Sequence, residues 1–209
     1  GEAEALEGNP DVTIVTGPGL ETFFLLANRN PDVGGVLSDP TVVLAMRYAL
    51  DYEGIKSLAG FAAATPPTVI AIGLFGAWGE DQAIKRDLDK ARELLAEAGY
   101  PDGFEVDMPY PTEFTTSGVD IDLLAQKVQA DLAEAGIQIN LVPTELMANL
   151  AEYRAGNLNL TLWPWLPSTP DINDYLELLP GGVLGNRSQW TEEGAESEIL
   201  ELRDQARVE

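Results

Sequence analysis

A helix, a glycine and a strand follow one another between Asp87 and Pro111, and this unit constrains the fold more than any other stretch. Asp87 is placed to cap the helix, and Gly99 supplies the left-handed conformation that ends it. Apolar residues recur at three- and four-residue spacing in the helix and alternate with acidic residues in the strand. These apolar positions are Leu88, Ala91, Leu94, Leu95 and Ala98, then Phe104, Val106, Met108 and Tyr110.

The same unit recurs along the chain. The sequence LAEAG at 95–99 is repeated at 132–136, each time at the end of an amphipathic run and before an alternating strand. A looser copy runs from Thr144 through Gly156 into the alternating residues 157–162. The repeat is explained either by an internal duplication or by the fact that LAEAG is a common sequence at the end of a helix. In both cases, successive helix, glycine and strand units predict an α/β fold with a mixed sheet and flanking helices.

No linker rich in Ser or Pro divides the 209 residues, so we expect one domain. Residues 1–9 read as a frayed, disordered terminus, and the apolar segment 60–79 as a loop at the edge of the domain. The predicted helices lie near 39–59, 87–98, 120–135, 144–155 and 191–206, with a short helical turn at 172–179. The predicted strands lie near 11–16, 22–27, 104–109, 137–142 and 157–163.

Composition excludes several classes of function. The formal net charge of −23 offers no basic stripe for nucleic acid and instead indicates a solubilising surface or attraction of cationic ligands. The chain has neither Cys nor His, which excludes disulfides, imidazole bases and the usual zinc sites. No run of 18 apolar residues is present, and the first residues lack the pattern of a signal segment.

The residues from Asp87 to Phe104 resemble the solute-binding proteins of ABC transporters known as extracellular solute-binding protein family 5. The segment from Asp39 to Ile55 is similar to the family's "D.RVR.AL.YAID...I" helix, and residues 129–142 to its "IQ..L...GI.V.L.." unit. Leu44 and Tyr52 stand where the family often has Arg, which we interpret as variation within a structural helix.

This resemblance implies that the chain is the later lobe of a longer, two-lobed periplasmic-binding-protein-like fold. It further implies a non-catalytic protein without cofactor, in the periplasm or another extracytoplasmic compartment, whose export signal is not in this chain. The implied partners are a small solute, such as a peptide or oligosaccharide, and an ABC transporter permease. One lobe supplies one wall of the cleft, so we expect the lobe alone to bind no solute tightly.

The predicted solute site lies where the strand at 157–163 ends. Strand periodicity places Trp163 opposite the leucine face, and Pro164 then directs Trp165 into the following loop. In open α/β sheets, ligands bind at the carboxyl ends of strands. Polar residues of the loop complete this part of the predicted site: Ser168, Thr169, Asp171 and Asn173.

Two further candidates come from comparison with peptide-binding members. These members have an Asp after the equivalent of Trp165 and an Arg after the strand that corresponds to Met108-Pro109. This chain has Leu166 to Ser168 and Tyr110 to Glu113 there. We therefore include Tyr110 in the predicted solute site, and also Arg187 as a candidate ligand for an anion. We expect the solute to be held by stacking and neutral hydrogen bonds rather than by a charged anchor. A protein-interaction domain without a small ligand, or a hydrolase using pairs such as Asp171 and Asp174 or Asp120 and Asp122, is the alternative.

Overall fold

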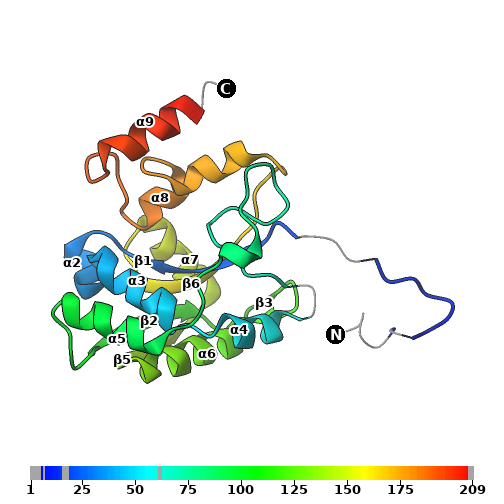
Figure 1. The fold of residues 1–209 in the computed structure, drawn as a ribbon, viewed down its shortest axis with the longest axis horizontal. Coiled ribbons are helices and arrows are strands. Elements are labelled where there is room, and N and C mark those ends of the chain that lie inside the picture. Colours follow the sequence, from blue (N-terminus) through cyan, green and yellow to red (C-terminus); the bar gives the residue numbers. More distant parts are fainter. Residues whose placement is uncertain (1–5, 7, 16–18, 61–62, 207–209) are drawn as a thin grey trace.

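The computed structural model describes residues 6, 8–15, 19–60 and 63–206. The predicted disordered terminus at 1–9 lies mostly outside the described residues and stays a prediction. The strand predicted at 11–16 is wrong for residues 11–15, which have no strand pairing, and Thr16 lies outside the described residues. Residues 8–15 extend away from the body of the molecule (Figure 1).

The strands that the structure describes form three pairs. β2 (Phe104–Pro111) and β5 (Ile137–Thr144) run parallel, with Phe104 opposite Ile137. β1 (Thr22–Ala27) and β6 (Leu160–Trp165) run antiparallel, and β3 (Thr115–Thr116) and β4 (Val119–Asp120) form a small hairpin. Asn159 donates a hydrogen bond of 2.8 Å to the Asp107 carbonyl and so connects β6 with β2. The mixed α/β architecture is therefore confirmed, although the sheet consists of separate pairs.

Two of the predicted helices are confirmed almost to the residue. α5 (Leu88–Glu97) begins after Asp87, whose carboxylate accepts the Lys90 amide, and α6 (Ile121–Glu134) begins after Asp120 in the same way. Gly99 has a φ of 91° and Gly136 a φ of 100°, so both occupy the region that disfavours side chains. A Cβ at Gly103 would lie 1.9 Å from the Gly136 carbonyl oxygen, so position 103 needs glycine because the two turns approach each other closely.

The long helix predicted at 39–59 is wrong, because the structure has α3 (Pro40–Ala49) and α4 (Tyr52–Ala59) there. Leu50 is extended, with φ −69° and ψ 133°. Asp51 donates its amide to the Asp131 carboxylate and accepts the Gly54 amide to start α4. The Asp51 amide thus donates to the buried carboxylate of Asp131 from α6, whereas in a continuous helix it would donate to a backbone carbonyl of the preceding turn.

The remaining elements are shorter than predicted or were not predicted. α7 (Leu146–Ala155) starts after Glu145 instead of Thr144, and α9 (Ser197–Ala206) replaces the helix predicted at 191–206. The helical turn predicted at 172–179 is confirmed as η3 (Ile172–Leu178). Four further short elements were not predicted: α2 (Pro31–Gly34), η1 (Gly35–Ser38), η2 (Glu80–Gln82) and α8 (Val183–Arg187).

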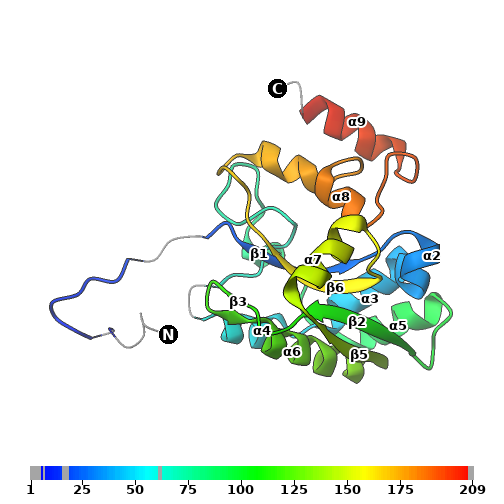
Figure 2. The same ribbon diagram turned by 180° about the vertical axis from the view of Figure 1, so that it is seen from behind.

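Two hydrophobic clusters lie on opposite faces of the β1–β6 pair. The larger contains Leu160 and Leu162 with residues of α3, α5, α6, β2 and β5. The smaller contains Leu26, Tyr153, Leu158 and Trp163. α7 therefore packs on the face that carries Trp163, and not on the face that carries Leu160 and Leu162. α5 and α6 lie at one end of the molecule and α8 and α9 at the other (Figures 1 and 2).

Candidate functional site

Trp163 belongs to the core of the lobe. It lies opposite Phe24 in the strand register, and its indole stacks on Tyr153 with ring centroids 5.1 Å apart. Only 7% of its surface is exposed, and Nε1 donates to Asn149 Oδ1 at 2.9 Å. Strand periodicity predicted the correct face, but α7 covers that face. Trp163 therefore acts in packing in this structure, and a solute-contacting role for it stays a prediction.

A chain of hydrogen bonds continues from Trp163 through the interior. Asn149 donates to Thr144 Oγ1 at 2.7 Å, and Thr144 donates to the Tyr110 carbonyl at 2.9 Å. Four elements are connected in this way: β6, α7, β5 and β2. Buried polar groups with satisfied partners fix the relative position of the elements that carry them. The chain therefore holds the ends of β6 and β2 in register.

Trp165 has a different environment. It is half-buried, lies opposite Thr22, and meets the ring of Tyr175 edge-on with centroids 4.9 Å apart. The Tyr175 hydroxyl accepts the Ala71 amide at 3.3 Å. Trp165 is thus positioned by η3 and by the coil at 63–79. Tyr175 was not among the residues predicted from the sequence, because its contact with Trp165 depends on how η3 folds back.

The loop after β6 keeps its predicted polar residues at the surface, where several of them bond to one another. Asp171 accepts the amide and the side chain of Asn173 at 2.8 and 3.0 Å, and Asp174 accepts the Thr169 amide at 2.8 Å. Ser168 is exposed next to them. These carboxylates shape the loop, and their hydrogen bonds leave no matched pair for acid and base catalysis.

Tyr110 points into the larger core instead of the surface. It is buried, and its hydroxyl donates to Asp122 Oδ1 at 3.0 Å. Burial and then this hydrogen bond raise the pKa of the Tyr110 hydroxyl. Asp122 also accepts Thr112 Oγ1 at 2.6 Å and the Glu113 amide at 2.9 Å, and hydrogen bonding, led by Thr112, lowers its pKa. Asp120 caps α6, so the second candidate carboxylate pair is also structural.

Arg187 lies over the ring of Tyr153, with its guanidinium carbon 4.8 Å from the ring centroid. The neighbouring Trp190 is instead covered by Arg29, at 4.5 Å. A cation over an aromatic face is a common stabilising contact. Ser168, Thr169, Asp171 and Asn173 thus lie in the loop that follows Trp165, whereas Tyr110 and Arg187 have partners elsewhere, and a solute-binding role for these residues stays a prediction.

Exposed apolar side chains occur directly after β6 and on the coil at 63–79. Leu166 is 61% exposed, Phe75 94% and Trp78 55%. A Cβ placed on Gly76 would lie 3.5 Å from Ile172 Cδ1, so the coil that carries Phe75 passes beside η3. A groove of about 200 Å³ lies there, lined mainly by Val69, Ile70, Ile172, Tyr175 and Leu176. Exposed apolar residues around a groove are typical of a surface that contacts a ligand or another protein part.

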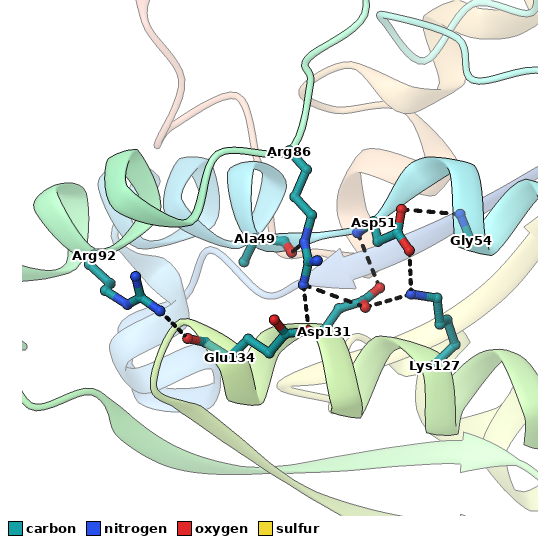
Figure 3. Close-up of polar contacts among 8 residues, drawn as sticks. All are labelled: Ala49, Asp51, Gly54, Arg86, Arg92, Lys127, Asp131 and Glu134. Carbon is teal, nitrogen blue, oxygen red and sulfur yellow. Dashed lines mark hydrogen bonds and ion pairs between the residues drawn. The ribbon is translucent and has the colours of Figure 1, made fainter.

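A cavity of about 440 Å³ lies elsewhere, between α4 and the segment 80–86, next to a network of charged residues. Lys127 lies 2.6 Å from Asp131 and 2.8 Å from Asp51, and Arg86 lies 2.8 Å from Glu134 (Figure 3). Burial lowers the pKa of Lys127, but its hydrogen bonds to Asp131 and Asp51 raise it by more. The network joins α6 to the junction of α3 and α4, and each of its cations lies within 4 Å of two carboxylates.

Within the part of the chain that the structure describes, no three His, Cys, Asp or Glu residues are grouped as a metal site. No helix among the described residues has the length and apolarity needed to span a membrane.

Known proteins are similar to this chain in sequence and in fold. Residues 1–184 match the family model of bacterial extracellular solute-binding proteins, family 5. Heme-binding protein A of Haemophilus influenzae is 28% identical over 188 residues, which cover 87% of this chain and 33% of that protein. A dipeptide-binding protein of Pseudomonas aeruginosa is 28% identical over 210 residues, covering 90% of this chain and 36% of its own length. The chain thus spans about a third of the length of these relatives.

Solved structures have the same fold. HbpA2 from Haemophilus parasuis superposes with a TM-score of 0.80 at 24% identity, over 98% of this chain and 43% of that one. The periplasmic binding protein AgaA, solved with agropinic acid, gives a TM-score of 0.71 at 27% identity, over 92% of this chain and 40% of its own. Because the family model matches most of the sequence, the chain belongs to the bacterial extracellular solute-binding proteins of family 5.

Proposed function

We propose that this chain is the ligand-binding lobe of an ABC-transporter substrate-binding protein that takes up peptides or related solutes. The family match over residues 1–184 carries the proposal, because the family consists of solute-binding proteins and not of enzymes. A dipeptide-binding relative and a structural neighbour solved with the peptide STSA support a peptide-type solute. On this proposal, the protein acts outside the cytoplasm and delivers its solute to a permease.

The end of β6 is the surface that suits this role. Trp165 packs against Tyr175, while Leu166 after β6 and Phe75 and Trp78 of the coil at 63–79 remain exposed. A monomeric protein covers most such residues, since exposed apolar surface is unfavourable in water. We infer that the solute and the rest of the longer protein cover them. Ser168, Thr169, Asp171 and Asn173 would then provide polar contacts at the rim.

Calorimetry on the complete protein tests this function. We expect saturable heats with at least one member of a panel of peptides, oligosaccharides and nickel complexes, and no turnover of the bound solute. Trp165→Ala should weaken binding by about 1–3 kcal/mol, as expected for loss of an aromatic contact. Leu202→Ala, an exposed residue of α9, serves as a control that leaves affinity unchanged.

The 209 residues alone provide a second test. One wall of a cleft leaves a solute half solvated, so the isolated lobe should bind every panel member weakly. Submicromolar binding by the lobe, or silence of the complete protein towards the whole panel, would contradict the proposal. If the complete protein binds none of the panel, the result would favour a protein-interaction domain whose partner covers Phe75 and Trp78.

A further inference from the structure

The helix α9 is held to the rest of the lobe by few contacts. It lies at the same end of the molecule as α8 (Figures 1 and 2). Of its residues, only Arg203 is buried, Ile199 and Leu200 are half-buried, and the others are exposed. A helix that buries so little apolar surface gains little free energy from packing. The docking of α9 therefore depends mainly on Arg203.

Arg203 is a buried cation whose contacts join three segments. Its side chain is 5% exposed, and Nη1 donates to the Pro180 carbonyl, just after η3, at 2.5 Å. The same nitrogen lies 2.6 Å from Glu192 Oε1, in the turn before α9, and Nη2 lies 2.7 Å from Asp204 Oδ1. Hydrogen bonds that involve charged groups are stronger than neutral ones. The guanidinium thus fastens α9 to the end of η3.

The same helix forms part of the groove beside η3. Ala206, in the last turn of α9, lines this groove together with Val69, Ile70 and Ile172. Detachment of α9 would remove part of the wall and widen the opening to the apolar side chains behind it. The helix is therefore placed as a strap that borders the groove and is fastened at Arg203.

Carboxylates on α9 and in the turn before it oppose this docking. Repulsion at three-residue spacing is expected along the helix, because residues three apart are neighbours on its surface. Arg203 and Arg29, which lies 3.9 Å from Glu196, are the basic residues that form ion pairs there. Salt screens exposed charges more strongly than buried contacts, so it should weaken the repulsion more than the bond of Arg203 to Pro180. The exposed acidic residues are Glu192, Glu193, Glu196, Glu198, Glu201 and Asp204.

We propose that α9 is a strap that opens independently of the rest of the lobe, closed by Arg203 and opened at low salt by repulsion between its carboxylates. Ionic strength then regulates access to the groove beside η3. The strap involves neither Trp165 nor the loop after β6. Its failure would therefore leave the proposed function intact.

Hydrogen–deuterium exchange of the complete protein, followed by mass spectrometry of its peptides, measures the opening of each helix. Arg203→Met keeps an apolar side chain and removes the donors, whereas Glu192→Gln removes only the charge of one partner. Arg92→Met is the matched control. Arg92 also donates to a backbone carbonyl, that of Glu134 at 2.8 Å, and pairs with a carboxylate, Asp89, but its side chain is 51% exposed.

We expect residues 197–206 to exchange at least about tenfold faster in Arg203→Met, because charge-assisted hydrogen bonds are lost. Glu192→Gln should give a smaller increase, and Arg92→Met none. α6 should keep its protection in Arg203→Met. Raising the NaCl concentration from about 0.01 M to about 1 M shortens the screening length from about 30 Å to about 3 Å. This change should slow the exchange of α9 in the unchanged protein.

Several results would overturn the proposal. Equal exchange of α9 in Arg203→Met and Arg92→Met would show that Arg203 does not close the strap. If α9 exchanged as slowly as α6 in the unchanged protein, or if Arg203→Met removed the protection of α6 as well, α9 would not open independently. Exchange of α9 that is unaffected or accelerated by 1 M NaCl would exclude opening by repulsion.

Discussion

Trp163 and Trp165 are two residues apart in one strand, yet they belong to regions of the lobe with different physical roles. Around Trp163, the indole, the amide of Asn149 and the hydroxyl of Thr144 all have partners within the lobe. Around Trp165, the ring itself is half-buried, and the next residue, Leu166, is exposed. The first region is packed and bonded within the lobe, and the second has the properties of a surface that another molecule or another part of the protein covers.

The largest expected effect lies in the first region. Trp163→Ala should lower the free energy of unfolding of the 209-residue chain by about 3–5 kcal/mol, because it leaves a cavity against Tyr153 and removes the donor to Asn149. Urea titration followed by circular dichroism measures the change. Trp165→Ala is the matched control and should cost clearly less. Equal losses for the two variants would remove the distinction between the regions.

A second effect of about 1–3 kcal/mol is expected in the charged network, away from the solute surface. Lys127→Met removes the closest cation from Asp131, whose side chain is only 4% exposed, and leaves Arg86 at 3.8 Å. Lys90→Met breaks an exposed ion pair with Glu93 and should cost less than Lys127→Met, because solvent screens the exposed pair. The same denaturation measurement applies. If the two lysines had equal effects, the network would not contribute more than an ordinary surface pair.

A smaller effect depends on pH. The pKa of Asp122 is lowered from its ordinary value of 3.8, so the stability it contributes is present above that value and is lost as pH falls through the folded-state pKa. The unchanged chain should therefore be more stable than Asp122→Asn at neutral pH. This difference should shrink as the solution is acidified below pH 3.8. Denaturant titrations at several pH values measure it, and a difference that stays constant would contradict the assigned hydrogen bonds.

The smallest effect is expected in the second region. Phe75 is 94% exposed, so Phe75→Ser should change the free energy of unfolding of the lobe by no more than about 0.5 kcal/mol. Trp163→Ala in the same titration shows that the assay detects a real loss. If Phe75→Ser lowered the free energy of unfolding by several kcal/mol, the coil at 63–79 would stabilise the fold and would not be a surface that a partner covers.

Local signals in the sequence were sufficient to predict much of the body of the lobe. Asp87 and Asp120 start their helices where a capping carboxylate is expected, and Gly99 and Gly136 end them, because caps and left-handed turns depend on near neighbours. The alternation of β2 and β5 likewise predicted strands at the right places. The family resemblance, confirmed by the match over residues 1–184, came from the order of these same units.

Contacts between distant residues were decided by the tertiary structure alone. The break between α3 and α4 depends on Asp131, the burial of Trp163 on α7, and the exposure of Trp165 on how η3 and the coil at 63–79 pack. The burial of Arg203 depends on the approach of α9 to the end of η3. The sequence by itself determined where α5, α6, β2 and β5 form, because their caps, turns and alternation depend on neighbouring residues. Which faces are covered, and which polar groups find distant partners, followed only from the packing of segments that are distant along the chain.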